Sequence, residues 1–181
     1  VTLANLEAVL TTQDAPAGCL GSFMRGAPES VELLTAAGFD VVGLANNHCM
    51  DFGAAGLKET KRVLADRGIA AAGAGRDTAA AREPVILERN GMRIGILAYC
   101  DDFVVDPAEL SRFTPAPARD AWILEDVGRL AESVDLVVLM LHWGYEFQLY
   151  PMLHHRDRAR RYAEAGADLV LCHHAHVPMA V

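Results

Sequence analysis

Three short apolar runs in the sequence are typical of buried strands. They cover residues 40–45, 135–141 and 168–172, and a shorter run covers Ile69–Ala72. The stretches between them that predict helices are Pro28–Ala37, Phe52–Arg67, Arg119–Glu132 and His154–Ala165, and the second of these has apolar positions on one face. Gly38, Gly68 and Gly166 stand where helix C-caps are expected. The chain therefore alternates helices with strands.

A tight turn interrupts this alternation in the middle of the chain. Asn90-Gly91 separates two apolar segments, residues 84–88 and 92–99, and Asn-Gly is the strongest short signal for a hairpin. Residues 101–117 are rich in turn formers and predict a surface excursion near the site. Repeated strand–helix units with one antiparallel hairpin favour an α/β domain with a mixed sheet.

Five of the seven histidines follow the ends of these strands closely: His48, His142, His173, His174 and His176. In an open α/β sheet, ligands bind in the crevice outside the carboxyl ends of the strands. Strands that deliver imidazoles to one edge would build a metal site or an acid–base site. The alternative is that these are unrelated loop histidines.

The side chains with suitable donor atoms for a metal ion are His142, His174, His176, Asn47 and Glu7. Imidazole with carboxylate and amide oxygen suits Zn, Fe or Mn. In an extended segment, His174 and His176 would project to the same face about 7 Å apart. Two metals roughly 3.5–4 Å apart could then take one imidazole each. One Zn with three protein ligands fits nearly as well.

His48 differs from the other histidines because Asp51 follows it three residues later. A carboxylate that orients an imidazole near a metal makes it a natural proton donor to a leaving group. The alternative is a turn in which Asn46 and Asn47 cap the following helix. Glu146, four residues past His142, is expected to support a ligand or touch substrate, or else to be an exposed loop carboxylate.

Bulk properties limit the function classes. The 181 residues, 52% of them hydrophobic, suit one domain with a real core. A net charge of −8 argues against a nucleic-acid partner, since Lys and Arg hold phosphate backbones. The four arginines between residues 156 and 161 are interleaved with acidic residues and predict a solvated helix face. No apolar run approaches the length of about 18 residues typical of a membrane span.

Four groups of residues, in this order, resemble the motifs of the bacterial capsule-synthesis CapA family, which is associated with poly-γ-glutamate. They are Asn5-Leu6-Glu7; Leu44-Ala45-Asn46-Asn47-His48 with Asp51 and Gly53; His142-Trp143-Gly144 with Glu146; and Gly166–Val170 followed by His173-His174-Ala175-His176. The family belongs to the calcineurin-like metallophosphatase superfamily. The resemblance implies mixed β-sheets flanked by helices in a four-layer α-β-β-α sandwich.

The resemblance also implies roles for individual residues. Glu7 takes the place of the carboxylate that bridges two metals. Asn47, His142 and His174 would bind the second metal, and His176 would serve the first. His48 would be the general acid, with Asp51 beside it, while Asn46, Glu146 and His173 would support the ligands or touch substrate. His173 stands where the superfamily commonly has a glycine.

The superfamily's opening strand motif would lie before Val1, and the family's sequence after the last motif is also absent. We therefore expect residues 1–181 to be a single CapA-like domain that is truncated at both ends. In the full-length protein, the resemblance implies an extracytoplasmic, membrane-anchored location.

The preferred hypothesis is a hydrolase with one or two divalent ions (Mn, Fe or Zn) that activate a water molecule. Its substrate would be a phosphoester or an anionic polymer, and a γ-glutamyl amide is chemically open. The alternative is a non-catalytic component that binds polymer or assembles within a capsule-synthesis membrane complex. A barrel-type amidohydrolase is a weaker rival, because it needs eight βα units and the sequence predicts far fewer.

Overall fold

The computed structural model describes residues 1–16, 22–101 and 113–179, and in it two β-sheets pack face to face. The first sheet is parallel, in the order β1 (Leu3–Asn5), β4 (Val41–Gly43), β5 (Ala70–Ala72). The second has the order β11 (Leu169–His173), β10 (Leu136–His142), β8 (Met92–Cys100), β7 (Val85–Arg89). Only β7 of this second sheet is antiparallel, through the hairpin predicted at Asn90-Gly91.

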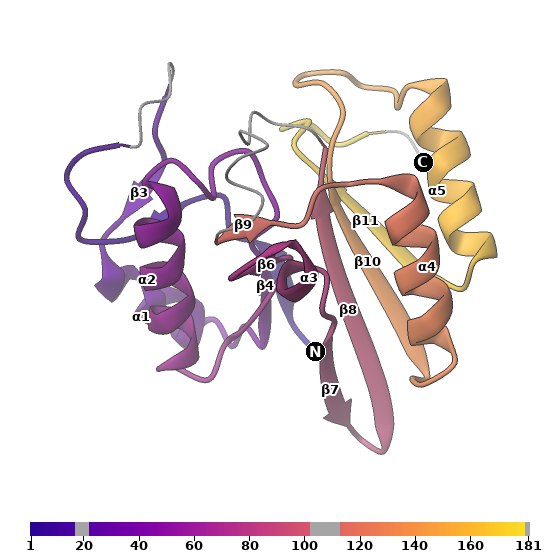
Figure 1. The fold of residues 1–181 in the computed structure, drawn as a ribbon, viewed down its shortest axis with the longest axis horizontal. Coiled ribbons are helices and arrows are strands. Elements are labelled where there is room, and N and C mark those ends of the chain that lie inside the picture. The colour runs from indigo at the N-terminus through magenta and orange to yellow at the C-terminus, as the bar shows by residue number, and fades with distance from the viewer. Residues whose placement is uncertain (17–21, 102–112, 180–181) are drawn as a thin grey trace.

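Two short strand pairs complete the described sheets. They are β2 (Val9–Leu10) with β3 (Arg25–Gly26), which is parallel, and β6 (Ala74–Gly75) with β9 (Thr114–Pro115), which is antiparallel. The helices are the 3-10 turn Pro28–Ser30, α1 (Val31–Ala36), α2 (Gly53–Ala65), α3 (Thr78–Ala81), α4 (Asp120–Ala131) and α5 (Leu153–Glu164). Helices α1 and α2 cover the first sheet and α4 and α5 cover the second (Figure 1). The predicted four-layer α-β-β-α sandwich is therefore confirmed.

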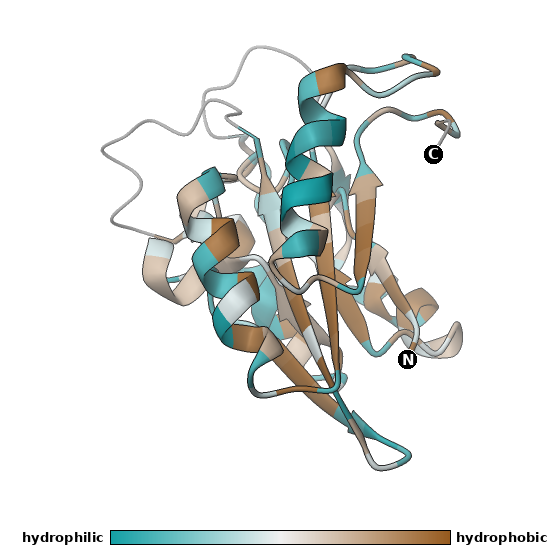
Figure 2. Cartoon of the chain, turned by 90° about the vertical axis from the view of Figure 1, so that its right-hand side faces the viewer, coloured by the Kyte–Doolittle hydropathy of each residue, from teal (hydrophilic) through white to brown (hydrophobic). Residues whose placement is uncertain are grey.

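Alternating side chains of the strands fill separate layers of the core. In β10, Val138 and Met140 pack between the two sheets, whereas Leu139 and Leu141 pack under α4 and α5. In β4, Val41 faces the second sheet and Val42 faces α2. A strand that is buried on both faces has no solvent-facing positions for polar side chains. This explains why these runs are continuously apolar in the sequence. The strands are accordingly brown beneath the hydrophilic α5 in Figure 2.

The predicted long elements are all present, with ends that shift by a few residues. Gly38, Gly68 and Gly166 have φ angles of 73°, 71° and 119°, so each ends its helix in the left-handed conformation predicted for it. Helix α3, strand β1 and the two-residue strands were not predicted, because they are too short to show a period. A local signal for α3 exists, because the Asp77 carboxylate accepts a hydrogen bond from the Ala80 N–H at 2.8 Å.

Two further findings concern the limits of the described chain. Most of the predicted surface excursion, residues 102–112, lies outside the described residues. Among the helices of the described ranges, none combines the length and the apolar character needed to cross a membrane.

Candidate functional site

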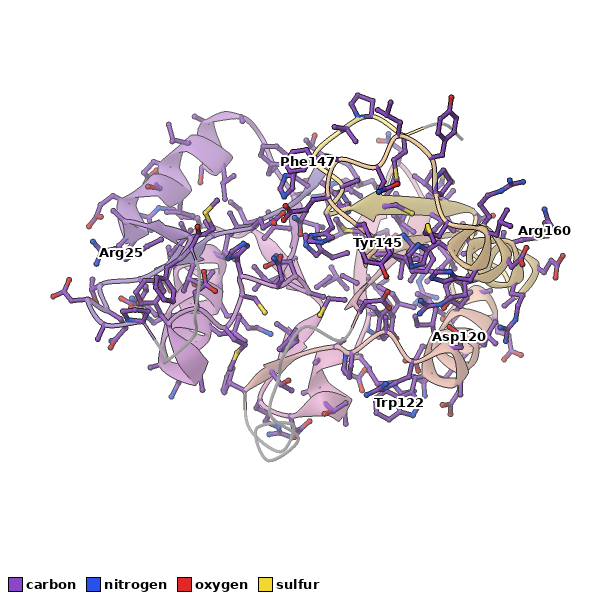
Figure 3. All side chains as sticks on the ribbon, turned by 90° about the horizontal axis from the view of Figure 1, so that it is seen from above. Arg25, Asp120, Trp122, Tyr145, Phe147 and Arg160 are labelled. Carbon is purple, nitrogen blue, oxygen red and sulfur yellow. The ribbon has the colours of Figure 1, made fainter. Side chains whose placement is uncertain are left out.

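The site lies where both sheets present the carboxyl ends of their strands to the same edge. The first sheet contributes Glu7 just after β1 and the segment Asn46–His48 after β4. The second sheet contributes His142 at the end of β10 and the loop from His173 after β11. The predicted gathering of these strand ends is therefore found, at the seam between the two sheets. Figure 3 looks down on this edge and shows Tyr145 and Phe147, from the loop after β10, between the two halves of the molecule.

Glu7 stands between two imidazoles. Its Oε1 atom lies 3.8 Å from His142 Nε2 and 3.7 Å from His176 Nε2. The donor atoms of Glu7, His142 and His174 all lie within 4.8 Å of one another. Asn47 Oδ1 lies 2.9 Å from His142 Nε2, so all five predicted ligands meet in one cluster. One carboxylate oxygen between two imidazoles suits the bridging role that the resemblance implies for Glu7.

Burial disfavours protonation of the central imidazoles. The His142 side chain is 1% exposed, and burial, assisted by the neighbouring His174 and His173, lowers its pKa to about 3. Burial also lowers the pKa of His173 and of His174. A metal ion binds the neutral imidazole, and these rings stand beside a carboxylate and an amide oxygen. The donor set therefore fits divalent transition-metal ions.

The segment that carries His174 and His176 is bent, so the geometry described for an extended segment does not apply to it. His174 has φ 94° and His176 has φ 54°, a region that side chains other than glycine rarely adopt. The two ring centroids lie 6.1 Å apart. Such strain concentrates at functional sites, and here it turns the donor atoms of both rings toward Glu146, with all three within 4.8 Å of one another.

A series of hydrogen bonds joins Glu7 to His48. Asn5 Nδ2 donates to Glu7 Oε2 at 2.9 Å, and Asn46 Nδ2 donates to Asn5 Oδ1 at 3.2 Å and to the Leu6 carbonyl at 2.9 Å. The His48 N–H donates to Asn46 Oδ1 at 3.1 Å. Asn46 thus supports a predicted ligand and the predicted acid together. Asn5 was given no role from the sequence, although its i, i+2 spacing from Glu7 places both side chains on one side of an extended segment.

Asp51 holds His48 in a fixed orientation. His48 Nδ1 lies 2.9 Å from Asp51 Oδ2, and the same oxygen accepts the Met24 N–H at 2.7 Å. The His48 side chain is 20% exposed, whereas that of Asp51 is 7% exposed. The alternative that the asparagines cap the next helix is not met, since the N-cap of α2 is Phe52 and no side chain caps it.

The loop after β10 closes over the histidine loop. The Phe147 N–H donates to the Ala175 carbonyl at 2.7 Å. Glu146, on this loop, is exposed to solvent. His173 ends β11 beside His142 in the strand register and lines the adjoining cavity.

The prediction of a solvated face for all four arginines on α5 is wrong for Arg158. Its guanidinium lies 2.8 Å from Asp120 Oδ1 and 3.2 Å from Asp101 Oδ1, and 4.8 Å over the ring of Trp143. This half-buried group supports the residue next to His142. Sequence spacing could not show it, because Asp101 and Asp120 belong to other elements.

Arg156 and Arg160 face a different environment from Arg158. They line a cavity of about 1040 Å³ together with Glu7, His173, His174 and His176. Figure 3 shows Arg160 beside α5, away from the seam. Both side chains are exposed. The cavity thus joins the metal-donor cluster to cationic side chains that an anion can reach.

Comparisons with known proteins show the family of this chain. The family model for the bacterial capsule synthesis protein PGA_cap matches residues 1–181. The Bacillus anthracis capsule biosynthesis protein CapA is 32% identical over 82% of this chain, which spans 38% of that protein. The Bacillus subtilis PGA biosynthesis protein CapA is 33% identical over 82% of this chain, which spans 40% of it. A Mycobacterium tuberculosis protein named for an accessory role in polyglutamine synthesis is 30% identical over the whole chain, which spans 51% of it.

Solved structures show the same fold at low sequence identity. A Staphylococcus aureus protein described as a candidate 5′-nucleotidase, in complex with alpha-ketoglutarate, matches 83% of this chain and 34% of its own. Its TM-score is 0.55 at 16% identity. A hypothetical protein from Thermus thermophilus matches 83% of this chain and 50% of its own, with a TM-score of 0.51 at 23% identity. This chain therefore shares its fold with these two proteins.

Proposed function

This chain belongs to the bacterial capsule synthesis PGA_cap family, which is linked to poly-glutamate capsule synthesis, and from the geometry of its site we propose that it is a metal-dependent hydrolase. Its substrate would be an anionic phosphoester or the γ-glutamyl polymer itself. The chain spans about half or less of the length of these relatives. The activity of the whole protein is therefore part of the proposal.

One observation carries the proposal: metal donors and a carboxylate-held imidazole meet at a single edge. Glu7 Oε1 lies within 3.8 Å of two imidazole nitrogens from the other sheet, and His48 is bonded to Asp51 at 2.9 Å. A metal site that served only structure would be closed by its protein ligands. This cluster instead opens into a cavity of about 1040 Å³.

The residues divide the chemistry between them. Glu7, Asn47, His142, His174 and His176 would hold the ions, which supply Lewis acidity and lower the pKa of a water molecule toward neutrality when bound. Asp51 engages Nδ1 of His48, so Nε2 of the protonated ring would donate a proton to the departing oxygen or nitrogen and leave the neutral imidazole. The buried Asp51 is itself fixed by the Met24 N–H, and a fixed donor needs little reorganisation during the reaction.

The cavity favours an anionic substrate. Arg156 and Arg160 stand one helical turn apart on α5, and both line the cavity that Glu7 and His174 also line. Two guanidinium groups at this spacing can bind successive carboxylates or a phosphate. The overall charge of −8 works against a polyanion, but bound metal ions would reverse the sign of the local field.

The same cavity favours the second candidate function, a non-catalytic component that binds polymer within a capsule-synthesis complex. The curated relatives are named for synthesis of the polymer and not for its hydrolysis. In that case the metal cluster would hold polymer carboxylates, and His48 would have no chemical task.

The decisive experiment compares the wild type and His48→Asn after reconstitution with Mn, Fe or Zn. Bis(p-nitrophenyl) phosphate and poly-γ-glutamate are the two probes, and ion content and polymer binding are measured alongside turnover. A hydrolase loses turnover in the variant and keeps its ions. Polymer binding without turnover in either protein would refute the enzyme and support the binding component.

A further inference from the structure

Glu146 belongs to a group of donor atoms that is separate from the one around Glu7 and His142. The Glu146 carboxylate lies with one nitrogen of His174 and one of His176 in a group whose atoms are all within 4.8 Å of one another. The group of Glu7, His142 and His174 has the same compactness. His174 is common to the two, so they are neighbours. Together they provide donors for two adjacent positions.

The protein holds Glu146 in this place through its backbone. The Phe147 N–H, next to Glu146, donates at 2.7 Å to the carbonyl of Ala175, which lies between the two histidines. Phe147 has φ 61°, His174 has φ 94° and His176 has φ 54°. The ring centroids of Phe147 and His176 are 6.3 Å apart. Two loops that each accept a costly conformation are thus bonded to each other at the point where the donors meet.

We propose that Glu146 is a direct carboxylate ligand of the ion that His176 holds, an inference that rests on the proposed metal-dependent function. Glu7 Oε1, 3.7 Å from His176 Nε2, gives that ion its second carboxylate. Two carboxylate oxygens and an imidazole nitrogen are a donor set that suits Mn, Fe or Zn. Glu146 is then a ligand and not merely a group that supports one.

The two ion positions differ in their access to solvent. The His176 side chain is 47% exposed and Glu146 is exposed, whereas the His142 side chain is 1% exposed. The ion beside Glu146 is therefore the outer one, which exchanges first. The ion beside His142 is the inner one. Removal of the Glu146 charge should weaken the outer ion selectively.

The test is a titration of the metal-free protein with Co²⁺, followed by absorption spectroscopy and calorimetry, for the wild type and for Glu146→Gln. The wild type is expected to bind two ions with separable affinities. The variant should bind the outer ion at least about 10-fold more weakly, because loss of a group that only supports a ligand already costs 10–100-fold. Its inner ion should keep its affinity and its spectrum.

Matched controls distinguish loss of a metal ligand from a general change in the conformation of the loop. Tyr145→Phe alters the same loop, and Glu132→Gln removes another exposed carboxylate, at the end of α4; both variants should bind two ions as the wild type does. Circular dichroism confirms folding, and Glu146→Asp should restore part of the outer affinity.

Two results would overturn this proposal and leave the proposed function standing. These are unchanged binding of both ions in Glu146→Gln, or equal weakening of both. A wild type that binds no ion would refute the proposed function as well.

Discussion

The two halves of the site are held in place by different means. On the first sheet, side chains hold the site residues through hydrogen bonds of 2.9–3.2 Å: Asn5 fixes the Glu7 side chain, and Asp51 and Asn46 fix the ring and the backbone N–H of His48. On the second sheet, His142 ends the regular strand β10, whereas bent backbone carries the other two imidazoles, with positive φ angles at His174 and His176. The oxygen-bearing half should therefore be sensitive to changes in residues that never touch the substrate. The imidazole half should be sensitive mainly to loss of the ligands themselves.

The largest expected effect separates chemistry from metal binding on the first sheet. His48→Asn should lower turnover of bis(p-nitrophenyl) phosphate by about 10²–10⁴-fold, the usual contribution of a general acid. Its metal content should stay at the wild-type level, because His48 is bonded to Asp51 and not to Glu7. His154→Asn, at an exposed histidine of α5, is the control. Loss of metal in His48→Asn would show that the ring acts as a ligand.

Asn46→Ala tests the side-chain support directly. The buried Asn46 side chain makes three hydrogen bonds, to Asn5, Leu6 and His48. Its removal should weaken metal binding by about 10–100-fold. Unsatisfied partners should also lower the free energy of unfolding by about 1–3 kcal/mol, measured with urea on the metal-free protein.

His174→Ala is the matched change on the second sheet. It should abolish ion binding yet cost the metal-free protein less stability than Asn46→Ala does. The reverse order would contradict the distinction between the two halves.

Low pH should destabilise the metal-free protein because of the buried His142 of the second sheet. Burial keeps the pKa of His142 at about 3, while an unfolded histidine titrates near 6.5. Below about pH 6.5 the unfolded chain binds a proton at His142 that the folded chain does not bind. The free energy of unfolding therefore decreases as the pH is lowered from about 6.5 to about 3. The midpoint of urea unfolding should therefore decrease between pH 7.5 and pH 5. In His142→Asn the midpoint should depend less on pH. A dependence as steep as that of the wild type would show that His142 is not the cause.

The smallest expected effect lies outside the metal cluster. Arg156→Ala and Arg160→Ala should each weaken the apparent affinity for poly-γ-glutamate by about 0.2–1 kcal/mol, or up to roughly fivefold, because both groups are solvent-exposed. The turnover number should stay unchanged, and added salt should remove the difference. Arg62→Ala, on the exposed face of α2, is the control for overall charge.

The strands, helices and hairpin could be predicted from the sequence more completely than the residues that hold the site in place. Continuous apolar strands and glycine caps are local signals, so β10, α2 and the Asn90-Gly91 hairpin were found. The predicted ligands do meet, because parallel strands present their carboxyl ends to one edge. Asn5 and Arg158 were assigned no supporting role, since their partners are chosen by the packed structure. The bend at His174 was missed because positive φ at a histidine has no local signature.

The hydrogen-bonded series from Glu7 to His48 also restricts how this sequence can drift. Asn5 and Asn46 stand 41 positions apart, yet the loss of either leaves a polar atom of the other without its bond. A second replacement then costs less than it would alone, so effects at these positions should not add. Paired exchanges should be tolerated where single ones fail, and evolutionary routes through this edge of the molecule should pass through few viable intermediates.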